Sequence, residues 1–258
     1  METVLVSAPA PAPAGVPVRQ HSRAGVTAVW AAAAVPMGLL AWVVAPAVAA
    51  ATRQRLGVPL IVALTAGLVW QFVLVLVLVG REQHSLRWAV LRRALWLEAP
   101  ADAARRRGGR LWLWLIPFIL GTGIVDLVPV GFTGPADRDL GAFLGSAAGR
   151  ATFRGAWGLF AVVVVLQLFN TVLGEELLFR GFLLPRMRGA FGRADWIVNG
   201  VLFGLYHLHE PWVIPQAMVQ GVFLLAFPVR RFRSAWLGIA IHSAESVFIL
   251  ALVLAVVS

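Results

Sequence analysis

Long apolar runs alternate with short arginine-rich or polar connections along most of the chain. A helix needs about 20 apolar residues to cross the hydrocarbon core of a bilayer. This pattern predicts an all-α fold, a polytopic transmembrane helical bundle of about seven spans, or eight if part of a polar connection is also buried. The seven predicted spans are Val26–Ala50, Leu56–Gly80, Leu111–Phe132, Trp157 to about Met187, Trp196–His207, Trp212–Val229 and Trp236–Val257.

The connections divide the chain into three predicted regions. Residues 1–24 are rich in Ala and Pro, which is typical of a disordered tail, and we place this tail in the cytoplasm. Residues 25–153 make up an N-terminal transmembrane region. Within it, segment 81–110 interleaves Trp and Leu with arginines, a pattern that predicts a basic amphipathic helix at the membrane interface. Residues 154–258 form a C-terminal core, which we expect to be catalytic.

The composition fits a membrane protein. Of the 258 residues, 60% are hydrophobic and 13% are charged, and the mean hydropathy is +0.82, whereas soluble domains carry about 25% charged residues. The chain has no cysteine, which excludes disulfides and thiolate metal ligands. The net charge of +10 comes from arginines that flank apolar segments and do not form one basic domain. We therefore expect contact with membrane lipids, and no nucleic-acid partner.

The arginines also predict the orientation of the chain. If the N-terminus is cytoplasmic and seven spans follow, 17 of the 22 arginines lie in cytoplasmic segments and 5 lie outside. An excess of Lys and Arg in cytoplasmic loops is the usual correlate of orientation in a bilayer. The sequence therefore predicts an integral protein of the cell (plasma) membrane with a cytoplasmic N-terminus.

Three groups of polar and ionisable residues interrupt the apolar C-terminal half. Such side chains are rare at membrane depth, pair with one another and usually mark a functional site. They therefore predict a polar site built between transmembrane helices. The candidate site residues are Glu175, Glu176, Arg180, His207, His242 and Ser246.

The spacing of the first group predicts an ion pair. Glu176 and Arg180 are four residues apart and face the same side of one helix. If that helix continues to Arg186, Glu176 lies about 15 Å from its inner end, at a depth where His207 can meet it. Glu175 points elsewhere and has no local partner, which favours it as a general base near neutral pH. The alternative is an ion pair that only fixes helix packing.

The histidines complete the predicted site. His207 ends an apolar helix, and His242 and Ser246 share one helix face at i,i+4 spacing. With the glutamates they could surround a water, which a Glu would activate while the imidazoles stabilise a tetrahedral oxyanion. Alternatively, Glu175, His207 and His242 could ligate a divalent metal such as zinc, or the histidines could form only a polar seam between helices.

No other catalytic motif competes with this interpretation. The chain has no HExxH zinc motif, no GxSxG elbow and no nucleotide-binding loop. A transporter or proton-coupled channel remains an alternative, since buried Glu, His and Arg also serve proton relays. The clustering of the polar residues in one half of the chain and the lack of an inverted repeat weigh against it.

The order and spacing of these residues resemble the motifs of the CPBP family, which are EExxxR, then FxxxH, then HxxxN or HxxxD. The resemblance covers roughly Trp157 to Val257. This family comprises type II CAAX prenyl endopeptidases and bacteriocin-processing or immunity-type proteins, also called the ABI family. The resemblance implies intramembrane proteolysis by a glutamate-activated water, in an enzyme class commonly described as metalloproteases. The residues that match its motifs are Glu175, Glu176, Arg180, Phe203, His207 and His242.

Ser246 departs from this pattern, because the family usually has Asn or Asp at that position. The resemblance implies that His242 and the residue four positions later support the oxyanion, so a shorter Ser side chain weakens this contact. We expect a peptide or lipidated-protein substrate that reaches the site from the cytoplasmic side. The alternative is a non-catalytic membrane binding or immunity protein on the same scaffold, which the Ser246 departure favours.

Overall fold

The structure is a computed structural model that describes residues 17–128 and 132–258. The predicted all-α fold is confirmed, and the described residues contain no β-strand. In chain order, the α-helices are α1 (Arg23–Leu39), α2 (Ala45–Thr52), α3 (Gly57–Gln83), α4 (Trp88–Ala94), α5 (Leu115–Leu127), α6 (Leu140–Gly145), α7 (Ala147–Phe153), α8 (Trp157–Leu168), α9 (Leu184–Arg186), α10 (Arg188–Phe191), α11 (Asp195–Tyr206), α12 (Ile214–Val219), α13 (Phe227–Phe232) and α14 (Ala235–Val257).

Several of these helices join through π-helical or 3-10 stretches into longer rods. The π-helical stretches are η1 (Leu40–Val44), η3 (Phe169–Gly174), η4 (Leu177–Leu183) and η8 (Gln220–Ala226), and the 3-10 stretches are η2 (Gly109–Trp114), η5 (Gly192–Ala194), η6 (His207–His209) and η7 (Pro211–Val213). Counted as continuous rods, six helices of the described chain are long and apolar enough to span a membrane, which indicates an integral membrane protein. They are Arg23–Thr52, Gly57–Gln83, Gly109–Leu127, Trp157–Arg186, Pro211–Phe232 and Ala235–Val257.

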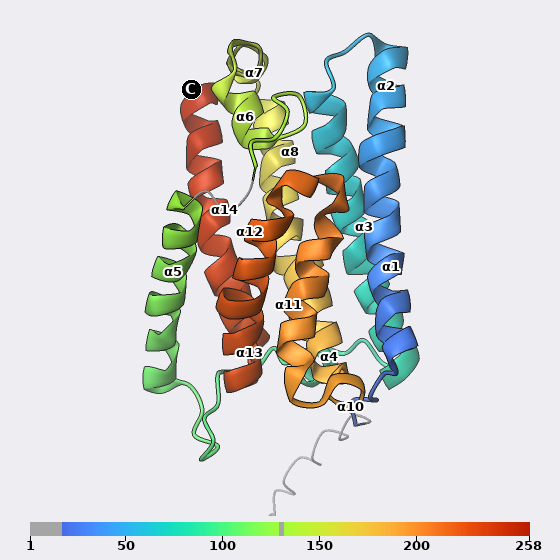
Figure 1. The fold of residues 1–258 in the computed structure, drawn as a ribbon, viewed down its shortest axis with the longest axis vertical. Coiled ribbons are helices and arrows are strands. Elements are labelled where there is room, and N and C mark those ends of the chain that lie inside the picture. Colours follow the sequence, from blue (N-terminus) through green and yellow to red (C-terminus); the bar gives the residue numbers. More distant parts are fainter. Residues whose placement is uncertain (1–16, 129–131) are drawn as a thin grey trace, which may run out of the picture.

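The sequence predicted about seven spans, and the segment missing from these six is Trp196–His207. It forms α11, which has 12 residues and is too short to cross the bilayer alone. Figure 1 shows α11 in the middle of the bundle beside the α12–α13 rod, with α5 and α14 on one side and α1 and α3 on the other. One face of α11 therefore packs against the bundle, whereas Ile197 and Leu205 on its other face are exposed.

Small residues allow α11 to approach its neighbour closely. Gly200 and Gly204 form a GxxxG pair, a spacing that lets helices pack backbone to backbone in membranes. A Cβ atom on Gly200 would lie 2.4 Å from the backbone of Val222, and one on Gly204 would lie 2.2 Å from the Met218 side chain. The α11–α12 hairpin therefore depends on the absence of side chains at these two positions.

The rod Trp157–Arg186 carries the first polar group of the sequence. The predicted continuation of this helix to Arg186 is confirmed, so Glu176 lies ten residues before its end. Glu175 and Glu176 form a short break between the π-helical stretches η3 and η4. Such stretches are rare and are often found at functional sites, where they change the direction of neighbouring side chains.

The predicted N-terminal tail falls largely outside the described residues, which begin at residue 17. Its last residues contact the bundle: the His21 amide donates to the Arg186 carbonyl at 2.9 Å, and Gln20 Nε2 donates to the Pro185 carbonyl at 2.9 Å. Arg186 itself is buried and pairs with Glu82 of α3 through a 2.8 Å contact. This end of the molecule, where α4 and α10 also lie (Figure 1), is its arginine-rich end.

We expect Gly200→Ala to lower the thermal stability of the detergent-purified protein, because the new methyl group would force α11 away from Val222. Overpacking of this kind costs about 1–3 kcal/mol. Gly123→Ala is the matched control, since nothing lies within 4 Å of a Cβ atom there. Equal melting temperatures for the two variants would contradict the close packing of the hairpin.

Candidate active site

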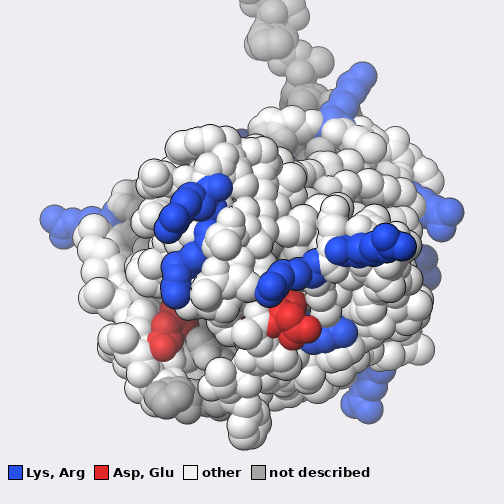
Figure 2. All heavy atoms as spheres, turned by 90° about the horizontal axis from the view of Figure 1, so that it is seen from above, with Lys and Arg blue, Asp and Glu red and all other residues white. Residues whose placement is uncertain are grey.

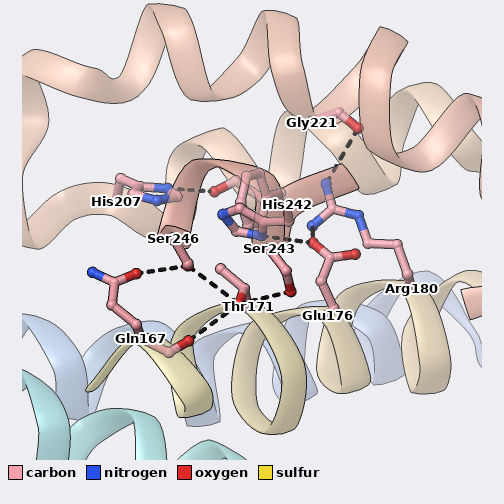
Figure 3. A network of polar contacts seen from close by, with 10 residues as sticks. Gln167, Thr171, Glu176, Arg180, His207, Gly221, His242, Ser243 and Ser246 are labelled. Carbon is pink, nitrogen blue, oxygen red and sulfur yellow. Dashed lines mark hydrogen bonds and ion pairs between the residues drawn. The ribbon is translucent and has the colours of Figure 1, made fainter. Parts of the chain in front are cut away.

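Glu176 lies at the centre of the polar network that Figure 3 shows. Its side chain is fully buried, and its Oε1 accepts a hydrogen bond from Arg180 Nη1 at 2.9 Å and one from His242 Nδ1 at 3.1 Å. Gly238 of α14 makes room for this carboxylate, because a Cβ atom there would lie 2.4 Å from Glu176 Oε2. The predicted pair of Glu176 with Arg180 is therefore formed, and a histidine from a third element joins it.

Arg180 connects the rod of α8 and α9 to the α11–α12 hairpin. Its side chain is fully buried, and its Nη2 donates to the carbonyl of Gly221 at 3.3 Å. Its guanidinium lies 4.0 Å from the ring centroid of Phe203, a cation–π distance. Removing one partner of such a buried pair leaves the other charge uncompensated, so Arg180 and Glu176 hold each other in place.

Glu175 differs from its neighbour because it lacks a cationic partner. The side chain is 2% exposed and lines the central cavity, and its Oε2 has no hydrogen-bond partner among the described residues. The sequence analysis predicted this difference from the turn of the helix between the two positions. A buried carboxylate that faces a cavity without a partner can accept a proton from a water placed there.

The imidazole of His207 also lines the cavity. Its Nδ1 donates to the carbonyl of Phe203, four residues earlier, at 2.9 Å. In a neutral imidazole this contact leaves Nε2 as a hydrogen-bond acceptor. The ring stacks on His209, with the ring centroids 5.4 Å apart.

The cavity has a volume of about 240 Å³, and four parts of the bundle form its wall. They are the first half of α3, the middle of the α8 rod, the tip of the α11–α12 hairpin and the middle of α14. Segment 137–140 and Phe143 close one side. The polar lining residues near the motifs are Gln167, Asn170, Glu175, His207, His209, Glu210, Gln216, Gln220, His242 and Glu245.

The cavity lies against the end of the bundle opposite the arginine-rich end. Segment 132–139 contacts the hairpin tip there: the Phe132 amide donates to the Trp212 carbonyl at 3.1 Å, and Trp212 Nε1 donates to Asp139 at 3.0 Å. Figure 2 views this end, which carries scattered arginines and two small acidic areas. The sequence analysis expected access from the arginine-rich side, because it had no information on how the segment before α6 folds over the hairpin.

Ser246 does not line the cavity, although the sequence placed it in the site. Its buried hydroxyl donates to Gln167 Oε1 at 2.7 Å and also lies 3.3 Å from Thr171 Oγ1. The single hydroxyl proton is therefore used within the protein. Ser246 and His242 come together on one face of α14 as predicted, but Ser246 contacts the α8 rod and not the space beside the glutamates.

Three residues that line the cavity are not among the candidate site residues of the sequence analysis. They are Gln167 of α8 and, at the hairpin tip, His209 and Glu210; His209 is 7% exposed and stacks on His207. The signal in the sequence for Gln167 is a lone polar residue in an apolar helix. His209 and Glu210 come directly before Pro211, a position that is also typical of a helix boundary at the membrane surface, so the sequence does not show that they line a cavity.

Glu210 lies in the turn between α11 and α12, outside the membrane-spanning helices. Its burial, together with the carboxylates of Asp139 and Glu175, raises the pKa of Glu210 to about 8. The unfolded chain loses this proton near pH 4.5, whereas the folded chain keeps it until about pH 8. The folded protein therefore loses stability from Glu210 as the pH rises between these two values.

Two of the residues suggested for a metal each use one ring nitrogen within the protein. His242 donates from Nδ1 to Glu176, and His207 donates from Nδ1 to a backbone carbonyl, so Nε2 of each ring has no partner in these contacts. Among the described residues, no group of three or more His, Asp or Glu is arranged to hold a metal ion. A catalytic zinc needs three protein ligands around one point.

Comparison with known protein families matches residues 156–248 to the type II CAAX prenyl endopeptidases described as Rce1-like. Residues 156–248 are a domain of this family. The chain has no match among the curated proteins or among the solved structures. The resemblance drawn from the sequence is thereby confirmed, and this CPBP domain includes all six candidate site residues.

Within the Rce1-like domain, the three motifs converge from three separate elements. The EExxxR motif lies on the α8 rod, the FxxxH motif on α11 and the last histidine on α14. Glu175, His207 and His242 all line one cavity, whereas Glu176 and Arg180 lie beside it and hold His242 and the hairpin. The site thus has a cavity-facing part and a supporting ion pair.

We expect Arg180→Met to destabilise the protein by about 3–5 kcal/mol, because it leaves the buried Glu176 carboxylate without its cation. The double variant Glu176→Gln/Arg180→Met should recover much of this loss. Denaturation in mixed micelles measures both effects. Arg106→Gln, which removes an exposed ion pair with Asp102, is the control and should change stability by less than about 1 kcal/mol.

We expect Glu210→Gln to melt at a higher temperature than wild type at pH 8, and the difference to shrink as the pH is lowered towards 5. The amide at position 210 does not ionise, so the variant lacks the destabilisation that ionisation of Glu210 adds in that window. Thermal unfolding at both pH values measures this. Glu98→Gln, at the arginine-rich end, is the control for the loss of a carboxylate. If the difference in melting temperature between Glu210→Gln and wild type did not change with pH, the raised pKa of Glu210 would be contradicted.

Proposed function

We propose that this protein is an intramembrane endopeptidase that hydrolyses a peptide bond with a water activated by Glu175. The observation that carries the proposal is the unpartnered Glu175 carboxylate in a cavity that it shares with His207 and His242 of the motifs and with His209. Its neighbour Glu176 is neutralised by Arg180. Of two adjacent buried glutamates, one is thus free for proton transfer and the other is held in a structural pair.

In the proposed reaction, a water lies between Glu175 and the carbonyl carbon of the scissile peptide. Glu175 takes one proton as the water oxygen bonds to that carbon, and the carbonyl oxygen becomes an oxyanion. Glu175 then passes the proton to the peptide nitrogen. The carbon–nitrogen bond breaks, and the products are a carboxylic acid and an amine.

The histidines position the reacting groups in this scheme. The Nδ1–H of His207 is held by a backbone carbonyl, so Nε2 can accept a hydrogen bond from the water. The Glu176 carboxylate orients His242 through Nδ1, as a carboxylate orients the imidazole of a catalytic triad. In this arrangement the ring of His242 is fixed, and its other nitrogen can face the substrate.

The cavity lining supports a peptide or lipidated-protein substrate with an apolar group next to the scissile bond. Leu60, Ile61, Leu64 and Leu68 of α3 form one apolar wall opposite the polar residues. We further propose that the arginine-rich end faces the cytoplasm of a plasma-membrane protein, since arginine concentrates on that side of bilayers. The described chain begins at the same end, at residue 17, which agrees with a cytoplasmic N-terminus. Membrane lipids surround the bundle in this proposal.

A second candidate is a non-catalytic binding or immunity protein on the same scaffold. The observation that favours it is that the Ser246 hydroxyl donates its hydrogen bond to Gln167 and does not face the cavity. An active site that lacked an oxyanion donor at this position would be slower by about 10²–10³.

We expect Glu175→Gln to reduce peptide cleavage by at least about 10²-fold, since the amide keeps the size of the side chain but cannot accept the proton. The measurement is the cleavage rate of peptides, lipidated and unlipidated, by the purified full chain in detergent or liposomes.

Glu98→Gln should cleave at the wild-type rate, because Glu98 lies at the arginine-rich end and pairs with Arg92. Wild-type cleavage by Glu175→Gln would refute the proposed base. A folded wild type that binds peptides without cleaving any of them would favour the binding protein.

A further inference from the structure

The proposed reaction leaves one requirement unmet. An oxyanion needs hydrogen-bond donors about 2.7–3.1 Å from its final position. Ser246 occupies the place from which the family pattern would supply one, but its proton goes to Gln167 Oε1 at 2.7 Å. A donor in place of this one, beside the imidazole of His242, must therefore come from a neighbouring group that faces the cavity.

Gln167 of α8 is such a group. The residue is 3% exposed and lines the same cavity as Glu175, His207 and His242. Because its Oε1 accepts from Ser246, its Nε2 is directed away from Ser246, as Figure 3 shows. No described residue accepts a hydrogen bond from this nitrogen. The amide thus presents two N–H donors that no described residue uses.

The neighbouring hydroxyls fix the orientation of this amide. Thr171 donates to the backbone carbonyl of Gln167 at 3.1 Å, and its oxygen lies 3.2 Å from Ser243 Oγ and 3.3 Å from Ser246 Oγ. The Thr171 proton is therefore committed to the helix backbone, and Thr171 Oγ1 can only accept from Ser246. Of the two acceptors near Ser246 Oγ, Gln167 Oε1 is closer, at 2.7 Å against 3.3 Å for Thr171 Oγ1, and it takes the Ser246 proton. A carboxamide accepts only through its oxygen, so the Ser246 contact determines which end of Gln167 faces the cavity.

We propose that Gln167 donates a hydrogen bond from Nε2 to the carbonyl oxygen of the scissile peptide as it becomes an oxyanion, and that Ser246 positions Gln167 for this contact. The assignment rests on the proposed peptidase function. It explains how a serine can stand where the family pattern has a carboxamide or carboxylate: the carboxamide is supplied by α8, and the serine on α14 holds it.

The first test compares Gln167→Glu with wild type in peptide cleavage. The carboxylate can still accept from Ser246, but the donor facing the cavity is lost. The expected result is a fall in kcat of about 10²–10³, with KM nearly unchanged, because the contact strengthens only in the transition state. Gln167→Met, which has a similar length and no charge, is the second variant in case a buried carboxylate prevents folding.

The control for both variants is Gln83→Met, which removes a buried amide at the arginine-rich end of α3. It should leave kcat and KM unchanged. A structural role for Gln167 would instead lower the melting temperature and raise KM without a specific fall in kcat.

Ser246 is tested through its dependence on Gln167. Ser246→Ala should lower kcat by about tenfold, and Ser246→Thr, which keeps the hydroxyl, should restore it. If Ser246 acts only by holding the amide, Gln167→Met/Ser246→Ala should be no slower than Gln167→Met alone. Additive losses in the double variant would overturn the positioning role.

These outcomes separate the two proposals. Loss of cleavage in Glu175→Gln together with wild-type kcat in both Gln167 variants would overturn this inference and leave the peptidase intact. Wild-type cleavage by Glu175→Gln, or no cleavage by folded wild type, would overturn the proposed function and this inference with it.

Discussion

The buried ion pair between Glu176 and Arg180 is the interaction on which the rest of the C-terminal core depends. Two charges are kept out of water at membrane depth, and each offsets the desolvation of the other. The carboxylate also orients His242, and the guanidinium reaches Gly221 and the ring of Phe203. One pair thereby connects the three elements that carry the sequence motifs, and of the two adjacent glutamates it leaves Glu175 free.

A second constraint comes from the lack of water in the bilayer core, where every backbone group needs a partner inside the protein. Pro36 interrupts the hydrogen bonding of α1, and the carbonyl of Ala32, one turn earlier, accepts instead from Trp70 Nε1 at 2.8 Å. The same logic applies at the site, where Arg180 and Asn199 donate to carbonyls of Gly221 and Phe179. Backbone carbonyls of the irregular helices near the cavity thus find hydrogen-bond donors in buried polar side chains.

Much of the fold and site could be predicted from local patterns. The length of the apolar runs predicted the helical bundle, and the i,i+4 spacing predicted the Glu176–Arg180 pair, because a helix alone brings those residues together. The short helix α11 was predicted as a full span, since an apolar run does not show whether a helix of 12 residues crosses the bilayer or only packs on its neighbours. Gln167 was missed because its role depends on Ser246, 79 residues away.

The sequence by itself therefore determined the helical bundle, the buried charges and the family of residues 156–248, since each depends on composition or on the spacing of residues along the chain. Only the tertiary structure decided which side chains face the cavity. The directions of Glu175, Ser246 and Gln167 depend on the register between the α8 rod and α14, and that register is set by close contacts such as Gly238 against Glu176. Such contacts join residues far apart in the chain, where no local pattern records them.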